Sequence, residues 1–121
     1  MSKRVMIVDD SKEVREIVSF VLHSHGFKVL EAANGYQLQQ LLSSDSEELP
    51  DLIILDVMMP GEDGFRICRG LRSDPFTQHI PIMIITAHAE DIYQRISVDL
   101  GAASHMTKPF HPLELAERVK Y

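Results

Sequence analysis

Five polar residues have the types and positions that phosphoryl chemistry requires. The carboxylates of Asp9, Asp10 and Asp56 and the hydroxyl of Thr86 each follow a short apolar run, and the ammonium of Lys108 stands directly before a proline. Carboxylates about 4 Å apart repel one another by roughly 1 to 4 kcal/mol per pair, so a site that keeps them ionised needs a cation. Mg²⁺ fits this role, because it prefers oxygen ligands and commonly bridges one or two carboxylates to a phosphoryl group.

A carboxylate beside Mg²⁺ can attack phosphorus and form an aspartyl phosphate. Positioning and charge stabilisation supply most of the catalysis in phosphoryl transfer. In such a site Lys108 would neutralise one phosphoryl oxygen, and the Thr86 hydroxyl would form a hydrogen bond to another.

The elements that must position these residues alternate along the chain. Short apolar runs typical of buried parallel strands alternate with stretches of helical spacing, which predicts repeated βα units. The expected strands cover residues 5–9, 28–32, 51–56, 82–86 and 104–108. The inner faces of the expected helices fall within 14–22, 38–42, 65–71, 92–100 and 115–119.

Five such units predict an α/β fold with a doubly wound five-stranded parallel sheet, strand order 2-1-3-4-5, and helices on both faces. The first and third strands are neighbours in that order. Because ligands bind at the carboxyl edge of such sheets, Asp9, Asp10 and Asp56 are expected to converge there.

Composition restricts the classes of protein. With 121 residues the chain is expected to form one domain over 1–121, and its net charge of −6 argues against direct nucleic-acid binding. The single Cys68 cannot form an internal disulfide, which fits a reducing compartment. No apolar run has the length of a secretory or membrane-spanning segment, so we expect a cytoplasmic protein without membrane contact.

Four segments together resemble one family. They are IVDDS at 7–11, LIILDVMMPGEDGF at 52–65, ITA at 85–87 and TKPF at 107–110. In this order and spacing the chain resembles the receiver domain of bacterial response regulators in two-component signalling, a CheY-like domain with a flavodoxin-like fold. The resemblance spans the chain from Arg4 to the final helix.

The resemblance implies a phosphoacceptor and a metal site. Asp56 would accept the phosphoryl group, and Asp9, Asp10, Asp56 and the backbone carbonyl of Met58 would hold Mg²⁺, with Mn²⁺ as the alternative cation. The donor would be a phosphohistidine on a sensor histidine kinase or a histidine phosphotransfer protein, and small phosphodonors would also serve. Such a domain is a signalling switch that catalyses only its own phosphorylation and autodephosphorylation.

The resemblance also implies an output surface. Phosphorylation would draw Thr86 and Lys108 inward and change the face formed by the fourth helix, fifth strand and fifth helix. That face would carry Arg95, Asp99, Glu114, Arg118 and Lys120. Mixed charges suit a homodimer formed on phosphorylation or another partner contact, and they equally suit an ordinary solvated surface.

Three residues stand at positions that vary the behaviour of receivers. His105 lies three residues before Lys108, where the family usually carries a Tyr or Phe switch, and an imidazole there suggests pH-dependent signalling or, alternatively, a plain surface histidine. Met58 and His88 each lie two residues after a site residue, at positions that tune dephosphorylation in the family.

Each site residue has an ordinary structural alternative when it is taken alone. Asp10 and Glu13 have the spacing of a capping box. Asp56 could end a strand, Thr86 could cap a helix, and Lys108 could be a solvated charge. The convergence of all of them on one sheet edge favours the site.

Two rival functions start from the same residues. A phosphohydrolase of the haloacid-dehalogenase type also uses an Asp nucleophile, but it needs a second Asp two residues later, where this chain has Met58. A receiver-like scaffold would bind its partner whatever its phosphorylation, and the intact set of five site residues argues against it. Any output domain beyond Tyr121 is not visible in this sequence.

Overall fold

The computed structural model describes residues 3–44, 49–57, 59, 61, 63–86, 104–107 and 112–120. The strands are β1 (Arg4–Val8), β2 (Lys28–Ala32), β3 (Leu52–Asp56), β4 (Ile82–Thr86) and β5 (Ser104–Thr107). The helices are α1 (Lys12–Ser24), α2 (Gly35–Ser44), α3 (Gly64–Ser73) and α5 (Pro112–Lys120). The fourth helix expected near 92–100 lies outside the described residues.

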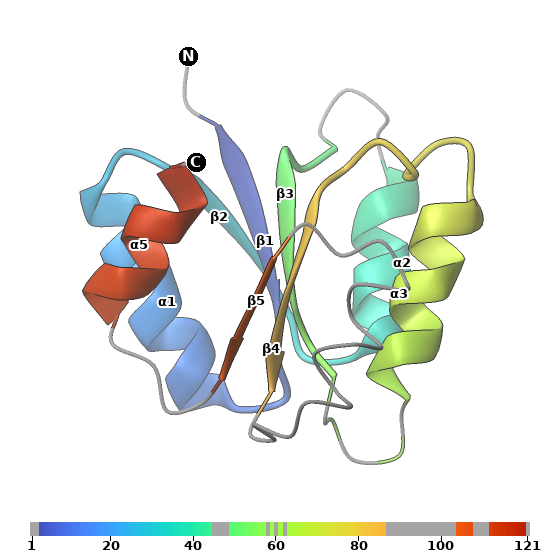
Figure 1. The fold of residues 1–121 in the computed structure, drawn as a ribbon, viewed down its shortest axis with the longest axis horizontal. Coiled ribbons are helices and arrows are strands. Elements are labelled where there is room, and N and C mark those ends of the chain that lie inside the picture. Colours follow the sequence, from blue (N-terminus) through green and yellow to red (C-terminus); the bar gives the residue numbers. More distant parts are fainter. Residues whose placement is uncertain are drawn as a thin grey trace.

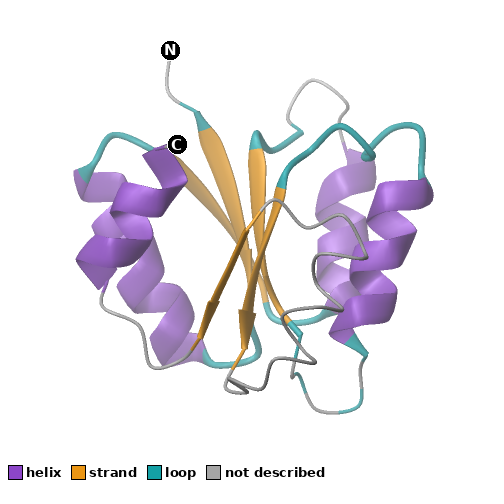
Figure 2. Cartoon of the chain, viewed as in Figure 1, coloured by secondary structure: helices purple, strands orange, loops and turns teal. Residues whose placement is uncertain are grey.

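The strands form one parallel sheet in the order β2-β1-β3-β4-β5, which confirms the predicted topology (Figure 1). Helices α1 and α5 cover one face and pack against each other, and α2 and α3 cover the other face (Figure 2). The inner strands β1 and β3 are apolar on both sides because both faces of the sheet are covered.

Two hydrophobic clusters follow from this arrangement. Val5 and Ile7 of β1 join the cluster beneath α1 and α5, whereas Met6 and Val8 join the cluster beneath α2 and α3. This alternation is the two-residue period of a strand. In β1 and β3, which lie inside the sheet, it leaves the strand ends as the places for polar side chains with a chemical role.

The first strand ends earlier than predicted. It stops at Val8, so Asp9 follows β1 instead of ending it. Lys108, the predicted last residue of the fifth strand, lies outside the described residues. At the other end of α1, Gly26 has a φ of 89°, a left-handed conformation that glycine adopts without steric strain. Its amide donates to the carbonyl of His23 at 3.0 Å, so this glycine, directly after the C-cap His25, ends the turn that closes α1.

The amino edge of the sheet lies opposite the edge where the predicted site residues gather. At the amino edge, the Arg4 amide donates to Asp51 Oδ2 and the Asp51 amide donates to the Arg4 carbonyl, both at 2.8 Å. Helix α5 ends on this side of the sheet, where β1 begins (Figure 1). Among the described residues, no helix has the length and apolar character needed to cross a membrane.

Candidate phosphoryl-transfer site

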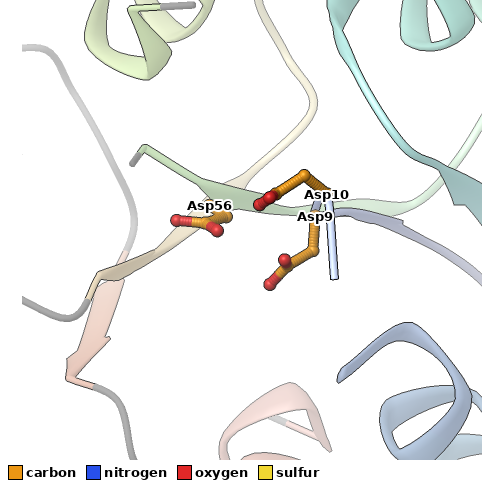
Figure 3. A group of neighbouring side chains, drawn as sticks. All are labelled: Asp9, Asp10 and Asp56. Carbon is orange, nitrogen blue, oxygen red and sulfur yellow. The ribbon is translucent and has the colours of Figure 1, made fainter. Parts of the chain in front are cut away.

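Three carboxylates meet at the carboxyl edge of the sheet. Val8 of β1 pairs with Leu55 of β3, so the next residues, Asp9 and Asp56, become neighbours. Asp10 completes the group, and ligand oxygens of the three side chains lie within 4.8 Å of one another (Figure 3). Asp9 and Asp56 are buried, whereas Asp10 is exposed. The predicted convergence of these three residues is thereby confirmed.

Asp9 is held by hydrogen bonds on both sides of its backbone. Its amide donates to the Ala32 carbonyl of β2 at 3.1 Å, and its own carbonyl accepts from Arg15 Nη1 at 2.7 Å. Its side chain is fixed as well, because Oδ1 accepts from the Ser11 amide at 2.9 Å. The buried carboxylate therefore has a defined direction before any ligand arrives.

Ser11, and not Asp10, is the N-cap of α1. The Ser11 hydroxyl accepts a hydrogen bond from the Val14 amide at 3.3 Å, and its backbone has the extended conformation of an N-cap. The capping-box interpretation of Asp10 and Glu13 is therefore wrong, because the helix begins one residue later than that spacing assumed. Asp10 stands outside the helix, next to the buried pair.

Asp56 ends β3 in the middle of the sheet. It pairs with Ile85 of β4, and the amide of Val57 still donates to the Ile85 carbonyl at 3.2 Å. The chain then returns to begin α3, whose N-cap Asp63 accepts from the amides of Phe65 at 3.0 Å and Arg66 at 3.3 Å. The residues on either side of the loop after Asp56 are thus anchored.

The donor set suits a hard divalent cation. All three side chains offer carboxylate oxygens, the ligand type that Mg²⁺ prefers. Two of these carboxylates are buried, where their mutual repulsion is least screened by water, so a cation would relieve it. The exposed Asp10 opens the group toward solvent, which suits an ion that keeps several of its waters.

Of the remaining predicted site residues, two have a described backbone position only, and three lie outside the described residues. Thr86 ends β4 and pairs with Thr107 of β5, the residue before Lys108. His105 is within β5 and pairs with Ile84. The side chains of Thr86 and His105 lie outside the description, as do Met58, His88 and Lys108 altogether.

Comparison with known proteins identifies the family. The family model for the response regulator receiver domain matches residues 5–120. The chain belongs to this family. Residues 5–120 contain every predicted site residue, and the match agrees with the parallel five-stranded sheet and its acidic edge.

Transcriptional regulatory proteins are among its relatives in sequence. The transcriptional regulatory protein GltR of Pseudomonas aeruginosa is 39% identical over 118 residues, covering 98% of this chain and 48% of that protein. The phosphate regulon transcriptional regulatory protein PhoB of Escherichia coli is 36% identical over 120 residues, covering 99% of this chain and 51% of that protein. This chain thus spans about half the length of the curated relatives it matches.

Solved receiver structures share the fold over nearly their whole length. The chemotaxis response regulator CheY4 of Vibrio cholerae has a TM-score of 0.89 with 28% identity, covering 99% of this chain and 98% of that chain. A putative response regulator from Chloroflexus aurantiacus also has a TM-score of 0.89, with 36% identity and coverage of 99% and 96%. This receiver domain is therefore a signalling domain of the response-regulator type.

Three residues near the receiver site escaped the reasoning from sequence. Arg15 and Glu31 carry no motif, and they meet across sixteen positions of the chain, with Arg15 Nε 3.3 Å from Glu31 Oε1. Gly64 is preceded by Asp63, a turn signal, but its close approach to Val57 requires the folded backbone. Neither the Arg15–Glu31 contact nor the Gly64–Val57 contact can be predicted from the spacing of residues along the chain.

Proposed function

We propose that Asp56 is the phosphoacceptor of a switch that is turned on by phosphorylation. The observation that carries this proposal is the group of three carboxylates at the ends of two adjacent strands, with Asp56 buried at the end of β3. Asp9, Asp10 and Asp56, with the backbone carbonyl of Met58, would hold Mg²⁺ or, alternatively, Mn²⁺. When bound, the cation would offset the charge of these carboxylates and of the incoming phosphoryl oxygens.

In the proposed reaction an oxygen of Asp56 attacks the phosphorus of a phosphohistidine donor. A bond from that oxygen to phosphorus forms, and the bond from phosphorus to the imidazole nitrogen of the donor breaks. The fixed direction of Asp9 limits the reorganisation that the acidic group must undergo during transfer. Beyond this self-phosphorylation and its reversal by water, we propose no enzymatic activity.

Two further residues would contact the transferred group. Thr86 ends β4, the strand next to β3, and so lies at the carboxyl edge with Asp56, while Lys108 comes directly after Thr107, the last residue of β5, in the sequence. We propose that the Thr86 hydroxyl binds one phosphoryl oxygen and that the Lys108 ammonium neutralises another. These contacts would couple the phosphorylation state to β4 and β5.

The output would pass through the fourth helix, β5 and α5. Phosphorylation must favour the active state by about 5.5 kcal/mol to convert a 1:99 population to 99:1, and a smaller difference would give a graded response. The proposed partners are a sensor histidine kinase or histidine phosphotransfer protein upstream, and a second copy of the chain after phosphorylation. The transcriptional function named for the relatives would involve the half of their length that this chain does not match.

The test is the intact mass of the protein after incubation with Mg²⁺ and acetyl phosphate. We expect one added phosphoryl group that hydroxylamine removes, and we expect Asp56→Asn to abolish it. Asp51→Asn is the matched control, because Asp51 lies at the amino edge, where its carboxylate binds the Arg4 amide. Failure with both acetyl phosphate and a phosphohistidine donor, in a chain that binds Mg²⁺, would refute the switch and favour a phosphorylation-independent scaffold.

His105 is the proposed source of pH dependence in the switch. An imidazole changes charge near about pH 6.5, whereas the Tyr or Phe usual at this position does not change charge near that pH. We expect partner binding by the phosphorylated chain to vary between about pH 6 and 7 and to lose this variation in His105→Tyr. Equal binding by both proteins across that range would make His105 an ordinary surface residue.

Met58 and His88 are proposed to set the lifetime of the phosphorylated state. An apolar Met58 disfavours an ordered attacking water, whereas His88 offers a group that can orient one. The hydrolysis rates of Met58→Asn and His88→Ala test the two roles separately. We expect faster hydrolysis in the first variant and slower hydrolysis in the second, and unchanged rates would remove both residues from the mechanism.

A further inference from the structure

Arg15 connects three structural elements beside the acidic group. It lies in the first turns of α1, its Nη1 donates to the Asp9 carbonyl at 2.7 Å, and its Nε lies 3.3 Å from Oε1 of Glu31 on β2. The Arg15 side chain is only 15% exposed, compared with 41% for Glu31. A guanidinium held in this way has a fixed place, unlike most surface charges.

The carbonyl that Arg15 binds belongs to the peptide group that joins Asp9 to Asp10. Holding that peptide plane sets the direction in which Asp10 leaves the backbone. The Asp9 amide is already bound to the Ala32 carbonyl of β2, so Arg15 and Glu31 add a second connection between this segment and β2. Asp10 is exposed, so burial restrains its position less than that of Asp9.

Glu31 also offsets the positive charge of Arg15 near the acidic group. A lone guanidinium beside three carboxylates would repel a divalent cation and attract the same oxygens that the cation needs. The Glu31 carboxylate balances this charge and holds the guanidinium on the β2 side. Removing the Glu31 charge would therefore weaken cation binding in two ways. It would add net positive charge near the site, and it would release Arg15 toward the carboxylates.

We propose that the Arg15–Glu31 ion pair is a positioning pair that presets the acidic group for its divalent cation and prevents Arg15 from competing with that cation. The inference rests on the proposed function, because it takes the acidic group as a Mg²⁺ site. It assigns Arg15 and Glu31 no contact with the phosphoryl group.

The test is the Mg²⁺ affinity of the whole chain, measured by calorimetric titration without a phosphodonor. We expect Glu31→Gln to weaken binding about 3- to 10-fold, with a smaller effect at high salt. Adding Arg15→Gln to this variant is expected to recover part of the affinity, because no unpaired guanidinium is then left. Arg15→Lys keeps the positive charge but loses the planar guanidinium that bonds the Asp9 carbonyl and Glu31 together. It is therefore expected to weaken Mg²⁺ binding even with Glu31 present.

The chain offers a matched control on the same helix. Glu16 pairs with Lys12 at 3.8 Å in an exposed pair, so Glu16→Gln removes the same unit charge without touching the Asp9 carbonyl. We expect its Mg²⁺ affinity to stay within about twofold of the native value. Thermal unfolding of each variant shows whether it remains folded at the temperature of the titration.

The outcomes separate this inference from the proposed function. Equal affinity in the native chain, Glu16→Gln and Glu31→Gln would overturn the positioning pair and leave the Mg²⁺ site in place. A double variant that binds as weakly as Glu31→Gln would overturn the competing role of Arg15. A native chain that binds no Mg²⁺ would overturn the proposed function and, with it, this inference.

Discussion

Gly64 lies so close to the backbone of Val57 that no side chain fits between them. A Cβ atom on Gly64 would be 2.2 Å from the Val57 Cα and 2.8 Å from the Val57 carbonyl carbon. The Gly64 amide also donates to the Val57 carbonyl at 3.4 Å. Because Val57 follows the proposed phosphoacceptor directly, this contact fixes the start of α3 against the backbone of the site.

Gly64→Ala is expected to disturb both stability and the site. The added methyl group meets backbone atoms, which cannot rotate away as a flexible side chain can, so we expect a loss of about 1 to 3 kcal/mol in the free energy of unfolding. The displaced Val57 should also slow phosphorylation from acetyl phosphate. Urea denaturation and the rate of mass gain measure the two effects.

Gly70 provides the control for this substitution. Apart from its chain neighbours and the backbone of its own helix, no described heavy atom lies within 4 Å of the position that a Cβ would take there, and Gly70 is inside α3. Gly70→Ala should therefore stabilise the protein by about 0.5 to 1 kcal/mol and leave phosphorylation unchanged. If Gly64→Ala were as stable as Gly70→Ala, the close packing against Val57 would not be a constraint in solution.

Ser11→Ala is expected to weaken the first turn of α1. Losing the acceptor for the Val14 amide should lower the free energy of unfolding by about 1 kcal/mol. Since that turn carries Arg15, Mg²⁺ affinity should fall as well. Ser11→Thr keeps a hydroxyl acceptor and should retain most of both quantities, and equal losses in the Ala and Thr variants would contradict the cap.

Asp51→Ala is expected to lower stability without changing phosphorylation. Its carboxylate accepts from the Arg4 amide at 2.8 Å, at the amino edge of the sheet. In Asp51→Ala we expect the free energy of unfolding to fall by about 0.5 to 1 kcal/mol while phosphorylation of Asp56 continues at the native rate. A comparable fall in the phosphorylation rate would show that the two edges are coupled.

Cys68 makes stability depend on pH in the alkaline range. Burial raises the pKa of its thiol above the ordinary 9.0, and the positive charge of Arg72 offsets this only in part. The native state therefore holds the thiol proton more tightly than the unfolded chain does, so the free energy of unfolding falls as pH rises above about 9. The slope should approach at most about 1.4 kcal/mol per pH unit.

Comparison with Cys68→Ala isolates this contribution. The variant lacks the thiol and should show a shallower decline in the free energy of unfolding from pH 8 to 10, although the lost volume makes it less stable at every pH. Parallel curves for the two proteins would mean that the thiol has the same pKa in both states. The same burial should make alkylation of native Cys68 slow.

The sheet and the acidic group of Asp9, Asp10 and Asp56 could be predicted from the sequence. Both depend on local apolar patterns and on the strand order of a doubly wound sheet. Apolar runs locate the strands, the order 2-1-3-4-5 puts the first and third side by side, and the residues after them must then meet. That reasoning places Asp9 beside Asp56 with no structural knowledge. The resemblance to the receiver family followed from the four motif segments, two of which contain these aspartates.

Other features depend on three-dimensional detail that spacing does not contain. Both Asp10 and Ser11 are good N-cap residues, and only the observed start of α1 at Lys12 decides between them. The contact of Arg15 with Glu31 depends on how α1 lies across β1 and β2. The contact of Gly64 with Val57 depends on the return path of the loop after β3.

The separation of the two edges of the sheet has a practical consequence for building reporters. β1 begins and α5 ends at the amino edge, across the length of the sheet from the end of β3 (Figure 1), and Asp56 is the last residue of β3. A fluorescent protein or affinity tag joined at either end would leave the acidic group accessible to donors. The domain can thus be fused to another protein while phosphodonors still reach the acidic group.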